Sequence, residues 1–132
     1  MILPNKVNWS EQFKIKIANA DPSFHKHEII KLLIVVKLIH KYKHVKQYLR
    51  IYTEFPVSEG NKCDVYFENL KSKEVFIYEI QKQFSDKWLK TKKEAYDLEF
   101  PFMKSTNFIP IDLNELSDNI NELDEQLERY IY

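Results

Sequence analysis

Two carboxylates and one amide have the spacing of a small metal-binding site. Residues 62–81 contain two runs rich in β-branched and aromatic residues on either side of a short polar stretch, which is typical of a β-hairpin. A turn centred between residues 71 and 72 pairs Asp64 with Glu79 across the two strands. Gln81 lies two residues beyond Glu79, so strand alternation places all three side chains on one face of the sheet.

The opposed acids Asp64 and Glu79 need a positive partner. Like charges directly opposite each other on a sheet destabilise it, and the repulsion grows when the pair is partly buried. A divalent cation removes that repulsion, since Mg²⁺ takes one or two carboxylates together with waters and phosphate oxygens. We therefore expect Mg²⁺, or Mn²⁺ in its place, at Asp64 and Glu79. The alternative is a solvent-facing acidic pair that a neighbouring lysine relieves.

Other kinds of chemistry are excluded by the counts of glycine and cysteine. The one glycine, Gly60, rules out a Walker loop, a dinucleotide-binding loop and a Gly-x-Ser-x-Gly nucleophile elbow, which all need several glycines. The one cysteine, Cys63, can form neither an intramolecular disulfide nor a multi-thiolate zinc site. The histidines show no zinc-ligand spacing and are expected to be surface or core residues: His25, His27, His40 and His44.

The hairpin is predicted to lie at the centre of a mixed α/β fold. Asp21 and Pro22 have the residue types of an N-cap and a first helical position, and residues 22–48 contain no later helix breaker, so one long helix is predicted there. The next three β-type segments are too close together for crossover helices. They predict an antiparallel meander of strands at 49–56, 62–68 and 74–81.

The chain after the meander is predicted to add a helix, an edge strand and a final helix. Ser85 has the residue type of an N-cap for a helix over residues 84–100. Residues 107–111 form a short strand, placed at the sheet edge because Pro110 has no N–H to donate. The fold class is therefore α/β (mixed), with the order helix, three-stranded antiparallel meander, helix, strand, helix, in a single domain of residues 1–132.

The C-terminal helix is predicted to begin at a cap formed by Asp112 and Glu115. Its apolar residues are spaced three and four apart and form a narrow, heptad-like seam: Leu113, Leu116, Ile120, Leu123, Leu127 and Tyr130. A seam of this kind pairs with a second chain or covers the domain's own sheet. The first alternative predicts a homodimer through the C-terminal helix.

Charge is distributed unevenly along a chain whose formal net charge is zero. Residues 23–50 hold seven Lys and Arg against one Glu, whereas residues 112–128 hold seven acids and no Lys or Arg. This pattern predicts a molecular dipole with one face suited to a polyanion. The alternative is that both runs are solvated faces of amphipathic helices.

The N-terminal residues carry few structural or targeting signals. Residues 13–18 alternate like a strand, although the same segment fits a Ser-capped helix. The first residues lack a basic stretch leading into an apolar one, and the longest aliphatic run, residues 32–36, is too short to cross a bilayer. Together with the lone cysteine, this predicts an intracellular protein that is neither secreted nor membrane-spanning.

The motif and element order together resemble the PD-(D/E)XK nuclease superfamily. An Asp on one strand, a short hairpin and a Glu-x-Gln on the next strand lie between a first helix and a helix–strand–helix segment. Archaeal Holliday-junction resolvases and small viral nucleases are the most similar in size, and the resemblance covers about residues 22–131 in element order. It implies a restriction-endonuclease-like core and a metal-dependent endonuclease or resolvase that hydrolyses phosphodiester bonds of DNA, branched DNA included.

The resemblance also implies roles for individual residues. Asp64 matches the first metal ligand, Glu79 the second, and Glu28 on the first helix the acid that often completes the site. Gln81 occupies the position of a lysine that orients the attacking water and stabilises developing negative charge, which a neutral amide does only through hydrogen bonds. The alternative is a catalytically silent protein of the same fold that binds nucleic acid or a protein partner.

Lysines of the second predicted helix are the expected contacts to nucleic acid. Lys82 follows Gln81 and is predicted to point to the opposite face of the sheet, so a substitute cation is expected from the helix instead. Phosphate contacts give sequence-independent affinity. The lysines in question are Lys87, Lys90, Lys92 and Lys93.

Overall fold

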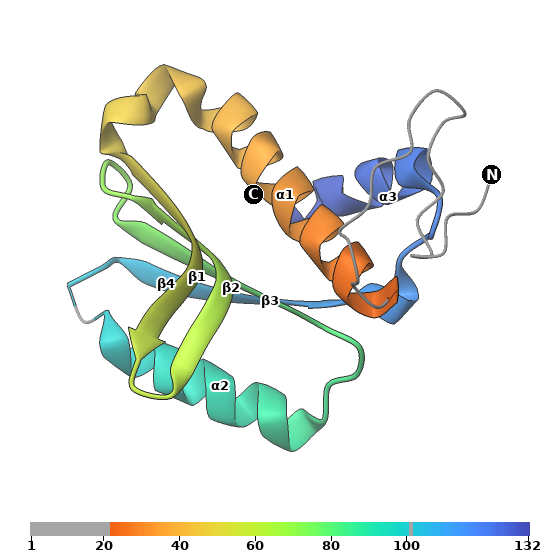
Figure 1. Cartoon of the computed structure of the whole chain (residues 1–132). Helices are drawn as coiled ribbons and strands as arrows, with labels where there is room; N and C mark the ends of the chain where they lie inside the picture. Colours follow the sequence, from red (N-terminus) through yellow and green to blue (C-terminus); the bar gives the residue numbers. More distant parts are fainter. Residues whose placement is uncertain (1–21, 101) are drawn as a thin grey trace.

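A four-stranded mixed sheet with helices on both faces forms the body of the molecule (Figure 1). The computed structural model describes residues 22–100 and 102–132. Helices α1 (Pro22–Tyr42) and α3 (Ile120–Leu127) lie on one side of the sheet, and α2 (Asp86–Glu99) lies on the other. The predicted mixed α/β class is confirmed. The predicted cap at Asp21 and the segment 13–18 lie outside the described residues.

The strands follow one another across the sheet in chain order. Neighbouring strands in the first three are antiparallel, whereas the fourth runs parallel to the third because α2 crosses over between them. Among the described strands the last one lies at an edge of the sheet, as its Pro110 predicts. The strands are β1 (Leu49–Ser58), β2 (Asn61–Asn69), β3 (Glu74–Gln81) and β4 (Ser105–Asp112).

The predicted register of the central hairpin is confirmed for residues 65–69, whereas the predicted pair of Asp64 and Glu79 is not among the paired residues. Val65 pairs with Tyr78 and Tyr66 with Ile77, as a turn centred between residues 71 and 72 requires. The Asn69 side chain closes this turn by accepting hydrogen bonds from the backbone N–H groups of residues 71 and 72.

Helix α1 ends earlier than predicted, whereas the predicted N-cap of α2 is confirmed. Helix α1 ends at Tyr42, and residues 43–48 continue it only as 3₁₀ turns that are interrupted at Val45, where the backbone leaves helical geometry. Helix α2 is confirmed with Ser85 as its N-cap, which accepts a hydrogen bond from the Trp88 N–H at 3.0 Å. No membrane-crossing helix exists in the described ranges, since none combines the length and the apolarity that a span requires.

The prediction of one C-terminal helix is wrong. Asp112 caps only a 3₁₀ turn (Leu113–Glu115), and a separate cap, Asn119, begins α3. The chain leaves helical geometry between the 3₁₀ turn and α3, so the predicted seam is divided into two parts. Both parts pack inside the domain. The seam residues buried in the core against α1 and the sheet are Leu113, Leu116, Leu123 and Leu127.

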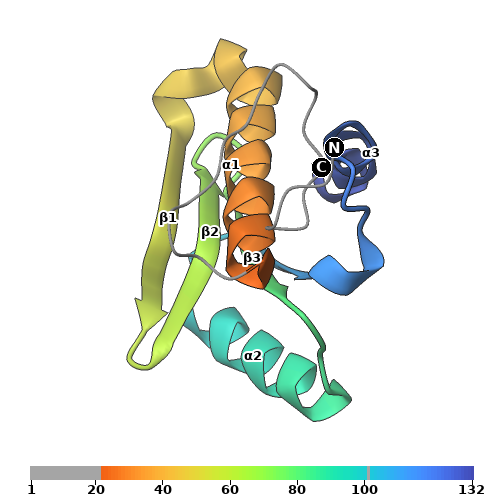
Figure 2. The ribbon, with the colours of Figure 1, turned by 45° about the vertical axis from the view of Figure 1, so that its right-hand side comes forward.

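The basic first helix and the acidic C-terminal segment pair within one chain. Lys37 of α1 lies 2.9 Å from Asp124, and Lys26 lies 2.9 Å from Asp118. Figure 2 shows α1 and α3 side by side. The seam therefore packs within the domain and the opposite charges pair within one chain, while the homodimer through the C-terminal helix stays a prediction.

Alternation along β1 and β2 breaks at one level of the sheet. In β1, Ile51 packs on the α1 side of the sheet and Phe55 on the α2 side. In β2, Val65 packs on the α1 side and Cys63 on the α2 side. Both residues of each strand are an even number of positions apart, so regular alternation would place them on the same side. In β1, Glu54 lies between Ile51 and Phe55, and its φ of 52° is unusual for a residue other than glycine. The break lies at Asp64 in the adjacent strand and changes the direction in which its side chain points.

Candidate functional site

An open hollow of about 570 Å³ lies where β2 begins and β3 ends, beside the first turns of α1. Three of the four predicted catalytic residues line it, together with a histidine, a second glutamate and a lysine. The lining residues are Phe24, His27, Glu28, Glu54, Asp64, Ile80, Gln81, Lys82 and Leu113.

Asp64 is fixed at both carboxylate oxygens. Its Oδ2 accepts a hydrogen bond from the Ile80 backbone N–H at 2.6 Å, which ties the side chain to the end of β3. Its Oδ1 lies 3.0 Å from Nε2 of His27 on α1. The carboxylate therefore faces the hollow in one orientation, with little rotamer freedom left to lose on binding a ligand.

His27 lies between two carboxylates. Nδ1 of its ring is 3.3 Å from Oε1 of Glu28, while Nε2 faces Asp64. Burial acts to lower the pKa of His27, but the hydrogen bond and charge of Asp64, and then Glu28, raise the pKa above its ordinary value. The imidazole thus fits the place that a positive group would take between these acids.

A lysine already balances the other acids of the hollow. Lys31 lies 2.7 Å from Glu28 and 3.0 Å from Glu54, and Lys62 lies 3.2 Å from Glu54. Burial acts to raise the pKa of Glu54, but both lysines lower it, and the net direction is downward. Glu54 also carries the unusual backbone of β1, a strain of the kind found at functional sites.

Glu79 does not share the face of Asp64. Its carboxylate accepts a hydrogen bond from Tyr96 of α2 and lies 4.0 Å from the Lys92 ammonium, and the residue is only 4% exposed. The expectation that all three motif side chains point to one face is therefore wrong, because the break in alternation turns Asp64 towards α1. Burial raises the pKa of Glu79, the charge of Asp64 raises it further, and the Tyr96 hydrogen bond and Lys92 oppose them.

Gln81 meets Asp64 at the hollow as predicted, since both line it. Lys82 lines the same hollow, which corrects the expectation that it points away. The physical reason is that β3 ends at Gln81, so the strand's alternation no longer governs the next residue. An exposed ammonium is thereby placed at the rim of a hollow that also holds the Asp64 carboxylate.

The four predicted DNA-binding lysines of α2 differ in their surroundings. Lys87, Lys90 and Lys93 are exposed, whereas Lys92 donates a hydrogen bond to Asn61 at 3.1 Å beside Glu79. Lys92 also lies 5.6 Å from the Tyr96 ring centroid. Its charge is therefore used inside the domain, and the exposed three are the ones that can contact phosphates.

Buried Cys63 lies on the α2 side of the sheet near the site. Burial, with the charges of Glu79 and Asp64, raises the pKa of its thiol to about 12. The thiol is therefore neutral at physiological pH and is not a nucleophile of this site.

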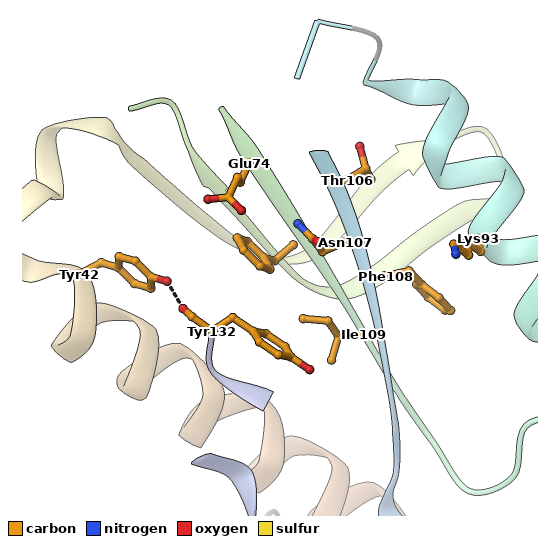
Figure 3. A pocket seen from close by; sticks show the side chains of 9 residues that line it. Tyr42, Glu74, Lys93, Thr106, Asn107, Phe108, Ile109 and Tyr132 are labelled. Carbon is orange, nitrogen blue, oxygen red and sulfur yellow. Dashed lines mark hydrogen bonds between the residues drawn. The ribbon is translucent and has the colours of Figure 1, made fainter. Parts of the chain in front are cut away.

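A second hollow, of about 550 Å³, lies at the other end of β3 along the edge strand β4 (Figure 3). Tyr42 donates a hydrogen bond to the Tyr132 carbonyl at its mouth, and Asn107 of β4 donates one to the Val75 carbonyl at 3.1 Å. None of the predicted catalytic residues lines it. The Asp64 hollow is therefore the better candidate for chemistry.

The donors of the Asp64 hollow fit a divalent cation by their chemistry. Carboxylate and amide oxygens are what Mg²⁺ and Mn²⁺ prefer, and an imidazole adds a nitrogen donor. In the described part of the chain, no three His, Cys, Asp or Glu residues are already arranged around one possible ion position. His27 and Asp64 instead bond directly to each other, so loading the site requires this hydrogen bond to open.

Three residues of the site are missed by reasoning from the sequence. His27 is expected from the sequence to be a surface or core residue, and no role is expected for Lys31 or Glu54. The one signal in the sequence is the adjacency of His27 to Glu28, with Lys31 three residues later on the same helix.

Comparison of the chain with protein-family models, with curated proteins and with solved structures found no match. The functional assignment therefore rests on the residues and geometry of the hollow.

Proposed function

We propose that the protein is a divalent-metal-dependent nuclease that hydrolyses phosphodiester bonds of DNA at the Asp64 hollow. The observation that carries the proposal is the Asp64 carboxylate, fixed through Ile80 and His27 in an open hollow that also holds Gln81. Glu79 lies on β3, directly before Ile80, whose N–H donates a hydrogen bond to Asp64.

The topology supports this proposal. An antiparallel meander of three strands, a crossover helix and a fourth strand parallel to the third agree with a restriction-endonuclease-like core. Asp64, Gln81 and Glu28 line the hollow where β2 begins and β3 ends, beside the first turns of α1.

Each side chain then has a role that its surroundings allow. A bound divalent cation supplies a more acidic water and stabilisation of the leaving oxygen. Asp64 would hold the ion, and Glu79 would join it by exchanging its hydrogen bond from Tyr96 for the ion, which would balance its buried charge. Gln81 orients water or phosphate through hydrogen bonds, and Lys82 at the rim offers the positive charge that Gln81 lacks.

The direct test is a cleavage assay on plasmid, single-stranded and four-way-junction DNA with Mg²⁺, Mn²⁺ or a chelator. We expect cleavage with either ion and none with the chelator. An absence of cleavage on all three substrates with both ions would reject the enzymatic proposal.

A second candidate is a catalytically silent protein that binds nucleic acid. It is favoured by the neutral Gln81 and by Glu79, which Tyr96 and Lys92 already satisfy. This candidate predicts DNA binding that is the same with and without divalent ions, and no cleavage.

Reversing two exposed lysines of α2 is expected to weaken DNA binding without changing sequence preference. Lys87→Glu with Lys90→Glu removes two cations that neutralise phosphates, and the slope of log affinity against log salt should fall by about 1 for each such phosphate. Fluorescence anisotropy on unrelated duplexes measures both quantities. A control with the same charge change, Lys71→Glu with Lys104→Glu, changes exposed lysines outside α2. Equal weakening by the control would contradict a role for α2.

A further inference from the structure

We propose that Nε2 of His27 is a ligand of the divalent ion at Asp64, and that this histidine makes the site select a first-row transition ion over Mg²⁺. The inference rests on the proposed function for the presence of an ion at Asp64. It assigns a ligand that the motif does not contain, and it changes the role of Glu28.

The separation of the two donor atoms already suits a shared ion. Nε2 of His27 lies 3.0 Å from Oδ1 of Asp64. Two ligands at right angles on an octahedral ion, each about 2.1 Å from it, are about 3 Å apart. Both donors therefore bind one ion after small rotations, without movement of α1 relative to β2.

Glu28 occupies the position of an outer-shell carboxylate. A metal-binding histidine usually gives its second ring nitrogen to a carboxylate, which fixes the ring and makes it a better donor. Nδ1 of His27 lies 3.3 Å from Oε1 of Glu28, and Lys31 holds the other oxygen of Glu28 at 2.7 Å. Glu28 is thus a positioning residue for His27, and its charge is already balanced by Lys31.

The ring plane of His27 has a further support. Phe24, one turn earlier on α1, stacks on it with 6.4 Å between ring centroids and 7° between the planes. Asp64 is held independently by the Ile80 N–H at 2.6 Å. Both proposed ligands are therefore oriented by contacts that do not involve an ion, which favours tight binding.

The nitrogen donor determines which ion is preferred. Mg²⁺ takes oxygen ligands almost exclusively, whereas first-row transition ions accept imidazole readily. A site of carboxylate, amide and imidazole donors therefore binds Mn²⁺ more tightly than Mg²⁺. A site formed by Asp64, Glu79 and Glu28 alone would have only oxygen donors and would have a smaller preference for Mn²⁺.

The experiment is electron spin echo spectroscopy of Mn²⁺ bound to the full chain without DNA, together with titration of Mn²⁺ and Mg²⁺. We expect ¹⁴N modulation from a directly bound imidazole in the wild type, and its loss in His27→Gln. The ratio of Mn²⁺ to Mg²⁺ affinity should fall by about tenfold or more in that variant. The control, His40→Gln with His44→Gln, changes exposed histidines of α1 and the 3₁₀ helix after it and should alter neither quantity.

Two outcomes overturn the inference, and they separate it from the proposed function. Mn²⁺ that binds and is lost in Asp64→Asn, but shows no ¹⁴N modulation in the wild type, refutes the role of His27 and leaves the nuclease proposal standing. Mn²⁺ and Mg²⁺ that bind equally well to wild type and Asp64→Asn refute both.

Discussion

Replacing Asp64 by Asn is expected to lower the rate of DNA cleavage by about a thousandfold. The amide keeps the size of the side chain and an oxygen for the Ile80 N–H, so the fold should remain. It removes the negative charge that would hold the cation and leaves only one carboxyl-type oxygen. The cleavage rate is therefore expected to fall while the stability of the fold is kept. Single-turnover cleavage with saturating Mn²⁺, beside a thermal unfolding curve, measures both effects.

The matched control is Asp97→Asn, which makes the same substitution at an exposed acid of α2. It should cleave at the wild-type rate. Cleavage by Asp64→Asn within a few-fold of wild type, with the control also active, would place the chemistry elsewhere in the molecule.

Replacing Leu123 by Ala is expected to cost about 2–5 kcal/mol of the free energy of unfolding. Leu123 is fully buried in the core between α3, α1 and the sheet, so the truncation leaves a cavity. Urea denaturation measures the loss, and Leu98→Ala, at a position 81% exposed on α2, should change the stability by less than about 0.5 kcal/mol.

The same variant also tests the corrected role of the C-terminal seam. Because Leu123 packs inside its own domain, the oligomeric state in sedimentation should be the same in wild type and variant. A wild-type dimer that Leu123→Ala dissociates, with the monomer's stability unchanged, would restore the seam as an interface between chains.

The parts of the fold that sequence reasoning predicted are those with strong local signals. The hairpin register followed from alternation on both sides of one turn, and Asn69 closes that turn by a side-chain hydrogen bond. The N-cap at Ser85 and the edge position of Pro110 likewise follow from what these residue types can donate or accept.

The site could be predicted only in part, because its geometry depends on one backbone irregularity. A positive φ at Glu54 is not suggested by its residue type, yet the break in alternation beside it turns Asp64 towards α1 and leaves Glu79 facing α2. His27 and Asp64 are 37 positions apart in the sequence, so their contact could not be predicted without knowing how α1 packs on the sheet.

The C-terminal error has a similar origin. The apolar spacing around Leu113 and Leu123 is helical in both halves, and nothing in that spacing marks the second cap at Asn119. Both halves are buried against α1, and this packing in the core favours two short helical segments over the one continuous helix that the apolar spacing predicts.

Anomalous diffraction from crystals soaked in Mn²⁺ shows whether Asp64 and Glu79 hold one divalent ion. The predicted result is an anomalous peak bonded to the Asp64 carboxylate, with Glu79 turned away from Tyr96 and bound to the same ion. A map from crystals saturated with Mn²⁺ that shows no peak at Asp64, with Glu79 still hydrogen-bonded to Tyr96, would rule out a shared ion at these two residues.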